Sequence, residues 1–229
     1  MDKKNLELAI ELRHDLHMHP ELSNEEVWTK QHLLNFIQYN TTNLDVIDYG
    51  NWFYAAYRVG EEGKPVYAFR ADFDALPMDE VIDIPWGSKI PGVAHKCGHD
   101  GHSASLMGFA LEVDQKGADK NIIFIFQPAE EVGDGAIQCV SVLTEENVDK
   151  IFGYHNLSGF KHKTVNVWDG NVQPASTGII IKFHRQTTDI LQLLPPAVCT
   201  GNQSSHRLHT RGTCHVAHRI HRTCGLRHP

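Results

Sequence analysis

The sequence of 229 residues predicts an α/β fold, because a strand, a helix and a second strand follow one another along the chain. Residues 65–70 form a short apolar run that is typical of a buried strand. Residues 103–117 place Leu106 and Phe109 on one side of a helix. Residues 121–126 are mainly β-branched and aromatic, as expected of a central parallel strand that is covered on both faces. This order predicts a βαβ unit.

Two helices are expected before this unit. Residues 5–18 place leucine and isoleucine among charged residues with helical spacing, and His19-Pro20 ends the pattern because the residue before proline is turned away from helical angles. A second helix is expected after Ser23, which is interpreted as its N-cap, with Glu26 three residues later. Short strands are expected in four further segments, residues 44–49, 52–59, 166–168 and 178–181.

Composition limits the classes of function. The chain is 41% hydrophobic and 21% charged, which is typical of a soluble globular protein. Its apolar runs are all shorter than the roughly 18 residues needed to span a bilayer, and residues 1–7 lack the apolar stretch of a secretory signal. We therefore expect a cytoplasmic protein with no membrane partner. The net charge is −7, so charge alone does not attract nucleic acid, and no nucleic-acid partner is expected.

The charge is unevenly distributed. Residues 183–229 hold six Arg, no Lys and one acidic residue, a balance of +5 that leaves −12 for the remainder. This segment also holds seven of the 16 His and has no aromatic residue after Phe183. It is interpreted either as a disordered basic tail or as the product of a shift in the coding frame. A third interpretation is an arm that binds an acidic partner or nucleic acid.

Acidic residues follow two of the predicted strands. Asp72 and Asp74 come directly after residues 65–70, and Glu130 and Glu131 come shortly after residues 121–126. In open α/β sheets, ligands bind beyond the carboxyl ends of the strands. A metal hydrolase needs one carboxylate to hold metal and another to accept a proton from the attacking water. Taken alone, Asp72 and Asp74 are more simply explained as caps of a turn before Pro77, and Glu130 and Glu131 as a solvated acidic loop.

Sulfur and imidazole groups add to these carboxylates. The run His95-Lys96-Cys97-Gly98-His99-Asp100-Gly101-His102 holds one thiol and three imidazoles, which suit zinc and its neighbours. His155 follows the apolar pair Ile151-Phe152. The ordinary alternatives are a His-rich loop with a buried free cysteine and a packed lone histidine. A zinc finger suits the pattern poorly, because it needs a paired second half at short spacing, whereas Cys199, Cys214 and Cys224 lie far along the chain and form no C-x-x-C. In combination, the four groups favour a metal site.

The same residues resemble a known family, the dinuclear-metal aminoacylases and carboxypeptidases, and more narrowly its amidohydrolase branch. Five segments carry the resemblance: residues 12–23, 70–77, 97–102, 128–131 and 154–156. The similarity covers about residues 5–182. It implies the N-terminal part of a zinc-peptidase-like catalytic domain, with an incomplete mixed sheet flanked by helices. It also implies the hydrolysis of the amide bond of N-acyl amino acids.

The resemblance further implies a role for each motif residue. It implies two divalent cations, which are zinc, manganese, cobalt or nickel. The implied metal ligands, with Cys97 as a bridging thiolate, are Cys97, His99, Glu131 and His155. Glu130 has the position of the general base. Asp72 and Asp74 would shape the site or orient the ligands.

The chain departs from the family pattern after Lys182. The resemblance implies a catalytic part over residues 1–177 and the first strand of a lid domain over residues 178–182, while residues 183–229 match neither the lid nor the resumed catalytic domain. The chain is therefore interpreted as truncated, with the lid domain missing. The family pairs through its lid, so the resemblance gives no support to a dimer of this chain. The alternative function is an inactive remnant that still binds metal.

Overall fold

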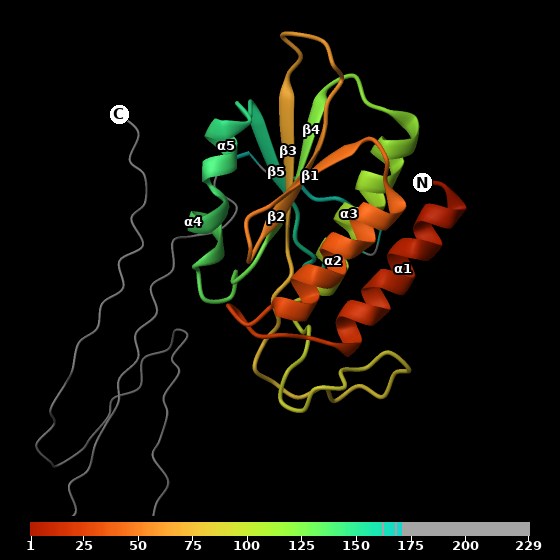
Figure 1. Ribbon diagram of the computed structural model, residues 1–229. Coiled ribbons are helices and arrows are strands. Elements are labelled where there is room, and N and C mark those ends of the chain that lie inside the picture. Colours follow the sequence, from red (N-terminus) through yellow and green to blue (C-terminus); the bar gives the residue numbers. More distant parts are fainter. Residues whose placement is uncertain (162, 168, 171–229) are drawn as a thin grey trace, which may run out of the picture. The chain divides into compact units, whose positions relative to one another are not determined.

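The computed structural model describes residues 1–161, 163–167 and 169–170 of the chain (Figure 1). Its helices and strands all belong to one compact unit, Met1–Phe160. The described residues of the second unit, which begins at Lys161, lie outside helices and strands. The strand expected over residues 166–168 is therefore wrong for its two described residues. The expected strand at 178–181 and the basic segment 183–229 lie outside the described residues.

A mixed sheet of five strands forms the centre of this unit, in the order β1-β2-β4-β3-β5. The strands are β1 (Leu44–Asp48), β2 (Phe53–Tyr57), β3 (Val66–Asp72), β4 (Asn121–Gln127) and β5 (Lys150–Gly153). β3 runs parallel to both β4 and β5, while β2 is antiparallel to β1 and to β4. The predicted α/β class and βαβ unit are confirmed. The expected central strand is also confirmed, because β4 lies in the middle of the sheet, runs parallel to β3 and packs on both faces, while its other neighbour, β2, is antiparallel.

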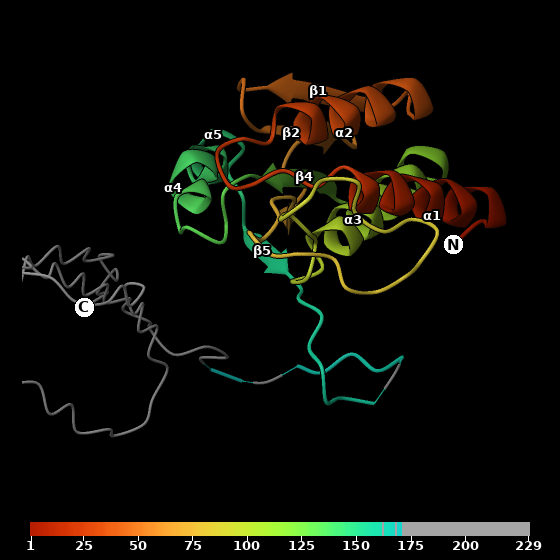
Figure 2. The same cartoon turned by 90° about the horizontal axis from the view of Figure 1, so that it is seen from below.

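Helices cover both faces of the sheet (Figures 1 and 2). Three longer helices, α1 (Lys3–Met18), α2 (Val27–Asn40) and α3 (His99–Lys116), lie on one side. Two short helices, α4 (Gly135–Cys139) and α5 (Ser141–Glu145), lie on the other.

The central strand β4 supplies both halves of the core. Phe124 and Phe126 pack into the cluster shared with the three longer helices, whereas Ile123 packs with Cys139 and Val142 of the two short helices. This alternation follows from the period of two along a strand. Full burial of a phenylalanine such as Phe124 contributes about 1.5–3 kcal/mol.

Two helix starts differ from the sequence prediction. α2 begins at Val27 with Glu26 at the N-cap, so the interpretation of Ser23 as the cap is wrong. Both polar residues make tertiary contacts instead: the Ser23 hydroxyl donates to Asp74 (2.7 Å), and the Glu26 carboxylate accepts the backbone N–H of Ala129 (2.7 Å). α3 begins at His99, four residues before the predicted start. The histidine-rich run therefore opens a helix.

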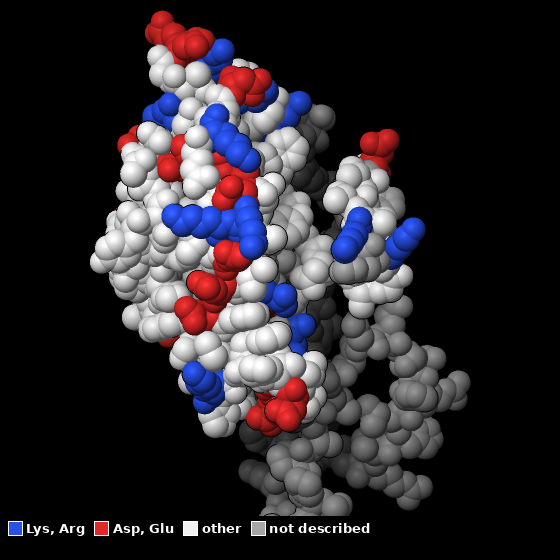
Figure 3. Space-filling view, turned by 90° about the vertical axis from the view of Figure 1, so that its right-hand side faces the viewer, with Lys and Arg blue, Asp and Glu red and all other residues white. Residues whose placement is uncertain are grey.

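The outer surface carries charges of both signs. Acidic and basic side chains lie beside one another on the face that Figure 3 shows. Exposed pairs such as Lys3 and Glu7, 3.6 Å apart, contribute little stability because water screens them. None of the helices in the described part of the chain combines the length and apolar character that crossing a membrane would require.

Candidate metal centre

The polar residues singled out in the sequence gather at one edge of the sheet. Because β3, β4 and β5 are parallel, their carboxyl ends meet at the same edge. The site is built from residues that end or follow these strands, together with the first turn of α3: Asp72, Asp74, Cys97, His99, Glu130, Glu131 and His155. Three groups of potential ligand atoms lie there, each with its atoms within 4.8 Å of one another. His99 belongs to all three.

His99 lies at the centre of the cluster and is fully buried. Its Nδ1–H donates to Asp74 Oδ1 at 3.0 Å, which in the neutral imidazole leaves the lone pair on Nε2. Nε2 is 3.7 Å from Asp72 Oδ2, 3.7 Å from Glu131 Oε1 and 3.9 Å from Glu130 Oε2. An imidazole that donates from one nitrogen to a carboxylate and presents the other nitrogen to acidic groups is arranged as a metal ligand.

His155 is held in the same tautomer by a different partner. Its Nδ1–H donates to the backbone carbonyl of Asn156 at 2.7 Å, so Nε2 carries the lone pair. That Nε2 lies 3.3 Å from Cys97 Sγ. Cys97, His99 and His155 form one of the three groups of potential ligands. The structure thus brings together sulfur and nitrogen donors that are 58 residues apart in the sequence.

Asp74 connects His99, in the first turn of α3, to Glu131, which follows β4. Besides the bond from His99, its carboxylate accepts the Ser23 hydroxyl (2.7 Å) and the backbone N–H of Glu131 (3.0 Å). It therefore fixes the tautomer of His99 and the course of the chain at Glu131 at the same time. Asp72 accepts the Nδ1–H of His102 (2.6 Å) and the Arg70 guanidinium (2.7 Å).

Burial and neighbouring charges shift the acidity of these groups. Burial favours a higher pKa for Asp72, but the hydrogen bond from His102 and the charge of Arg70 outweigh it and hold the pKa at about 2. Burial and the nearby Asp72 carboxylate raise the pKa of Glu130. Burial and the carboxylates of Glu131 and Glu130 raise the pKa of the Cys97 thiol to about 12. Coordination to a divalent cation would reverse this last effect and deprotonate the thiol.

Two buried atoms of the cluster test whether it suits a metal. His99 Nε2 and Glu131 Oε1 lack a hydrogen-bond partner among the described residues. A buried acceptor without a partner costs about 1–3 kcal/mol. A divalent cation would satisfy both acceptors, and the set of thiolate, imidazole and carboxylate donors suits zinc and its neighbours. The residues therefore fit a metal centre.

Sequence reasoning assigned no role to His102, which the structure places in this cluster. His102 forms a potential ligand group with Asp72 and His99. However, its Nδ1–H is bonded to Asp72, and its Nε2 contacts the side-chain oxygen of Asn156 and lies 3.3 Å from the backbone nitrogen of the same residue. Both ring nitrogens are thus engaged, in contrast to those of His99. The available signal was the spacing of three residues between the two histidines, which places them on one face of a helix.

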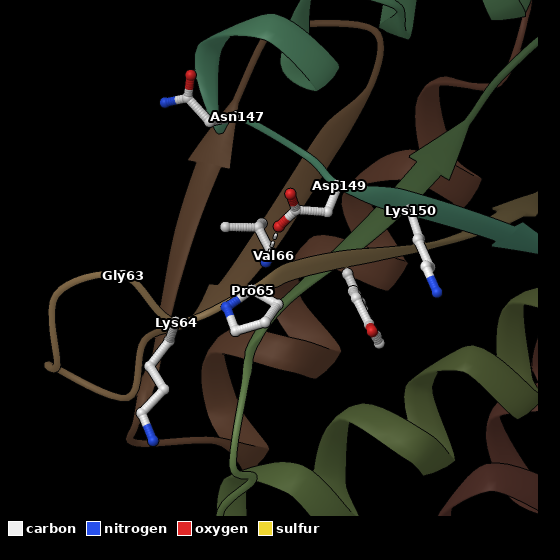
Figure 4. Close-up of a pocket in the computed structure, with 8 residues that line it drawn as sticks. Gly63, Lys64, Pro65, Val66, Asn147, Asp149 and Lys150 are labelled. Atoms are coloured by element: carbon white, nitrogen blue, oxygen red, sulfur yellow. Dashed lines mark hydrogen bonds between the residues drawn. The ribbon is translucent and has the colours of Figure 1, made fainter.

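A separate hollow lies at the opposite end of the sheet (Figure 4). It has a volume of about 520 Å³ and is lined by residues at the start of β3 and β5, among them Lys64, Val66 and Lys150. The carboxylate of Asp149 accepts the backbone N–H of Val66 there, at 2.8 Å. The hollow contains none of the potential metal ligands described above.

The chain belongs to peptidase family M20/M25/M40, whose sequence model matches residues 68–220. This confirms the resemblance to the dinuclear-metal aminoacylases and carboxypeptidases. N-acetylcysteine deacetylase from Bacillus subtilis (strain 168) is 40% identical over 164 residues, which are 70% of this chain and 43% of the relative. IAA-amino acid hydrolase ILR1-like 5 from Arabidopsis thaliana is 40% identical over 157 residues, which are 65% of this chain and 34% of the relative.

A solved structure is also similar. The Bacillus subtilis YXEP protein, described as a dinuclear metal binding peptidase from the M20 family, matches with a TM-score of 0.69 and 36% identity, over 80% of this chain and 51% of that protein. This likeness confirms the mixed α/β fold with flanking helices. The chain spans about half the length of the proteins it matches, or less.

Proposed function

We propose that the protein hydrolyses the amide bond of N-acyl amino acids with the help of two divalent cations. The observation that carries the proposal is the arrangement around His99, whose free Nε2 faces the carboxylates of Asp72, Glu130 and Glu131. The names of the relatives support the substrate class. One is named for the deacetylation of N-acetylcysteine, and another for the hydrolysis of an IAA–amino acid compound.

The proposed metal ligands are Cys97, His99, Glu131 and His155. They supply one sulfur, two nitrogens and carboxylate oxygens, a mixed set that accommodates zinc, manganese, cobalt or nickel. When bound, two cations would polarise the amide carbonyl and neutralise the charge that develops on its oxygen.

Glu130 is the proposed general base. Its side chain is 39% exposed, so it reaches both the cluster and a substrate that enters from solvent. The raised pKa makes its carboxylate a stronger base than an ordinary glutamate. Glu130 takes a proton from the attacking water, whose oxygen bonds to the carbonyl carbon of the amide, and passes this proton to the nitrogen of the leaving amine. The amide C–N bond breaks, and a carboxylate and a free amino acid result.

The proposal is tested with purified protein in two steps. The bound metal is first measured by elemental analysis, and hydrolysis of N-acetyl and N-benzoyl amino acids is then followed with and without added metal. Glu130→Gln is expected to reduce turnover by about 10²–10⁴-fold, because proton transfer contributes a factor of this size, and to retain metal binding. Protein free of transition metals, or turnover that is unchanged in Glu130→Gln, would falsify the proposal.

A second candidate is a metal-binding protein without turnover. It rests on the same three groups of potential ligand atoms, which would hold metal whether or not an amide is hydrolysed. The same experiment separates the two candidates. Tight metal binding in wild-type protein without hydrolysis of either substrate supports the second candidate, and turnover that is lost in Glu130→Gln supports the first.

A further inference from the structure

A buried ionic cluster lies beside the metal centre but outside its proposed ligands. His17, near the end of α1, is 8% exposed, and Asp100, the second residue of α3, is 1% exposed. Glu80 belongs to the connection that follows β3. Arg13 donates to Asp100 (3.2 Å), and the Lys96 ammonium donates to Glu80. His17 lies between the two carboxylates.

Both ring nitrogens of His17 face a carboxylate. Nδ1 is 2.9 Å from Asp100 Oδ2, and Nε2 is 2.9 Å from Glu80 Oε2. An ionised carboxylate only accepts hydrogen bonds, so an imidazole that bonds to two of them donates from both nitrogens and carries a positive charge. The hydrogen bond to Asp100 raises the pKa of His17 against the opposing effect of burial, and the bond to Glu80 adds to the rise. His17 is thus a buried cation.

The groups that face His17 come from three parts of the chain. Asp100 and Glu80 accept from it, and Arg13 and Lys96 bind the same two carboxylates. The ring of His95 lies 6.3 Å from that of His17 and is buried. The Arg13 side chain is 55% exposed, so His17 is the principal buried counter-charge of Asp100.

Charge-assisted bonds at this position hold a long irregular segment. Residues 73–98 join β3 to α3 without forming a helix or strand of their own, and they end at Cys97 and Gly98, directly before His99. Structureless connections longer than about 12–15 residues are uncommon in compact domains. Three contacts anchor the segment to α1: the Lys89 N–H donates to the Met18 carbonyl (2.9 Å), Trp86 stacks on His14 (4.0 Å between ring centroids), and Glu80 bonds to His17.

We propose that His17, as a cation shared by Glu80 and Asp100, is a positioning residue that holds Cys97 and His99 in the geometry that binds metal. One bond of His17 fixes the segment that leads to Cys97, and the other fixes the first turn of α3 at the residue after His99. The inference rests on the proposed metal centre. His17 acts indirectly, because within the described part of the chain its hydrogen bonds reach neither Cys97 nor His99.

The decisive variant is His17→Gln, which keeps a polar side chain and removes the charge. Its matched control is His32→Gln, because His32 also faces a carboxylate of α1, Asp15 at 3.5 Å, but among the residues that the structure describes it bonds to none that is next to a proposed ligand. Zinc affinity is measured at pH 7 by titration against a competing chelator, with no substrate present. We expect His17→Gln to bind zinc about tenfold more weakly or worse, and His32→Gln to match wild type.

Two further measurements keep the inference separate from the proposed function. Nitrogen-15 chemical shifts of the His17 ring are expected to show both nitrogens protonated at pH 7. Amide hydrogen exchange of metal-free protein is expected to be faster over residues 77–98 in His17→Gln than in His32→Gln. A neutral His17, or zinc affinity in His17→Gln equal to that of the control, overturns the inference.

The possible failures are also distinguishable. If wild-type protein binds no metal, the proposed function fails, and unchanged exchange over residues 77–98 in His17→Gln then overturns the proposed role of His17 as well. If His17→Gln does not fold, as shown by circular dichroism, Glu80→Gln replaces it. That variant keeps the bond between His17 and the buried Asp100, and it is expected to weaken zinc binding and speed exchange in the same segment.

Discussion

The substitution Asp74→Asn tests the geometry of the metal centre most directly. The Asp74 carboxylate is buried and accepts three hydrogen bonds, from the His99 ring, the Ser23 hydroxyl and the backbone N–H of Glu131. Asparagine has nearly the same shape but only one accepting oxygen, and its NH₂ group donates. In either orientation of the amide, at least one donor loses its partner. If the NH₂ group faces His99, the ring proton moves to Nε2 and occupies the lone pair that would bind metal.

The magnitude follows from the bonds that are lost. A hydrogen bond to a charged group is worth about 1.5–3 kcal/mol, so the free energy of unfolding is expected to fall by about that amount. Loss of an outer partner of a metal-ligating histidine typically weakens metal affinity by about 10–100-fold. We therefore expect zinc affinity to fall by at least tenfold, which corresponds to about 1.4 kcal/mol.

The assay combines zinc titration against a competing chelator with urea denaturation of the metal-free protein. Asp149→Asn is the matched control, because Asp149 also accepts a backbone N–H, that of Val66, but lies at the opposite end of β3. This control is expected to leave zinc affinity unchanged. Affinity in Asp74→Asn within about twofold of wild type would refute the reasoning, because Asp74 would then play no part in holding His99.

Two further predictions concern stability. Phe124→Ala, at a fully buried position, is expected to lower the free energy of unfolding in urea by about 3–5 kcal/mol, and a loss below 1 kcal/mol would contradict the packing described above. The bidentate bond from Arg58 lowers the pKa of Glu146 against the effect of burial. The ion pair therefore stabilises the fold fully above the ordinary glutamate pKa of 4.5, and this stabilisation is lost as the pH falls through the lowered pKa. Because Arg58 is 47% exposed, we expect Arg58→Gln to cost at most about 1 kcal/mol at pH 7 and less at pH 3, and an equal cost at both pH values would argue against the ion pair.

The parts of the fold that local patterns encode were predictable from the sequence. β3, α3 and β4 each show their own periodicity, and a parallel βαβ unit follows from their order. The antiparallel pairing of β2 with β4 was not predictable, because strand order depends on contacts between distant residues. α4 and α5 have five residues each, too few for a helical period to stand out.

The candidate site was likewise predictable only where local sequence patterns encode it. The residue types indicated a metal centre because thiol, imidazole and carboxylate groups follow the strands. The predicted start of α3 at residue 103 left His99 and His102 in a loop, whereas the helix begins at His99 and places both on one face. Ser23 is a residue whose local sequence pattern predicts the wrong role. Its local pattern favours a helix cap, but a buried carboxylate 51 residues away takes the hydroxyl instead.

Gly98 shows how one residue joins the two halves of the site. Its φ of 99° is left-handed, which a residue with a side chain rarely adopts. A Cβ at this position would also lie 2.6 Å from the side-chain oxygen of Asn156, closer than such contacts allow. Glycine therefore lets the turn after Cys97 meet the chain that follows β5, and His155 reaches Cys97 Sγ because of this close approach. Convergence of the sulfur and nitrogen donors thus depends on a residue that donates nothing to a metal.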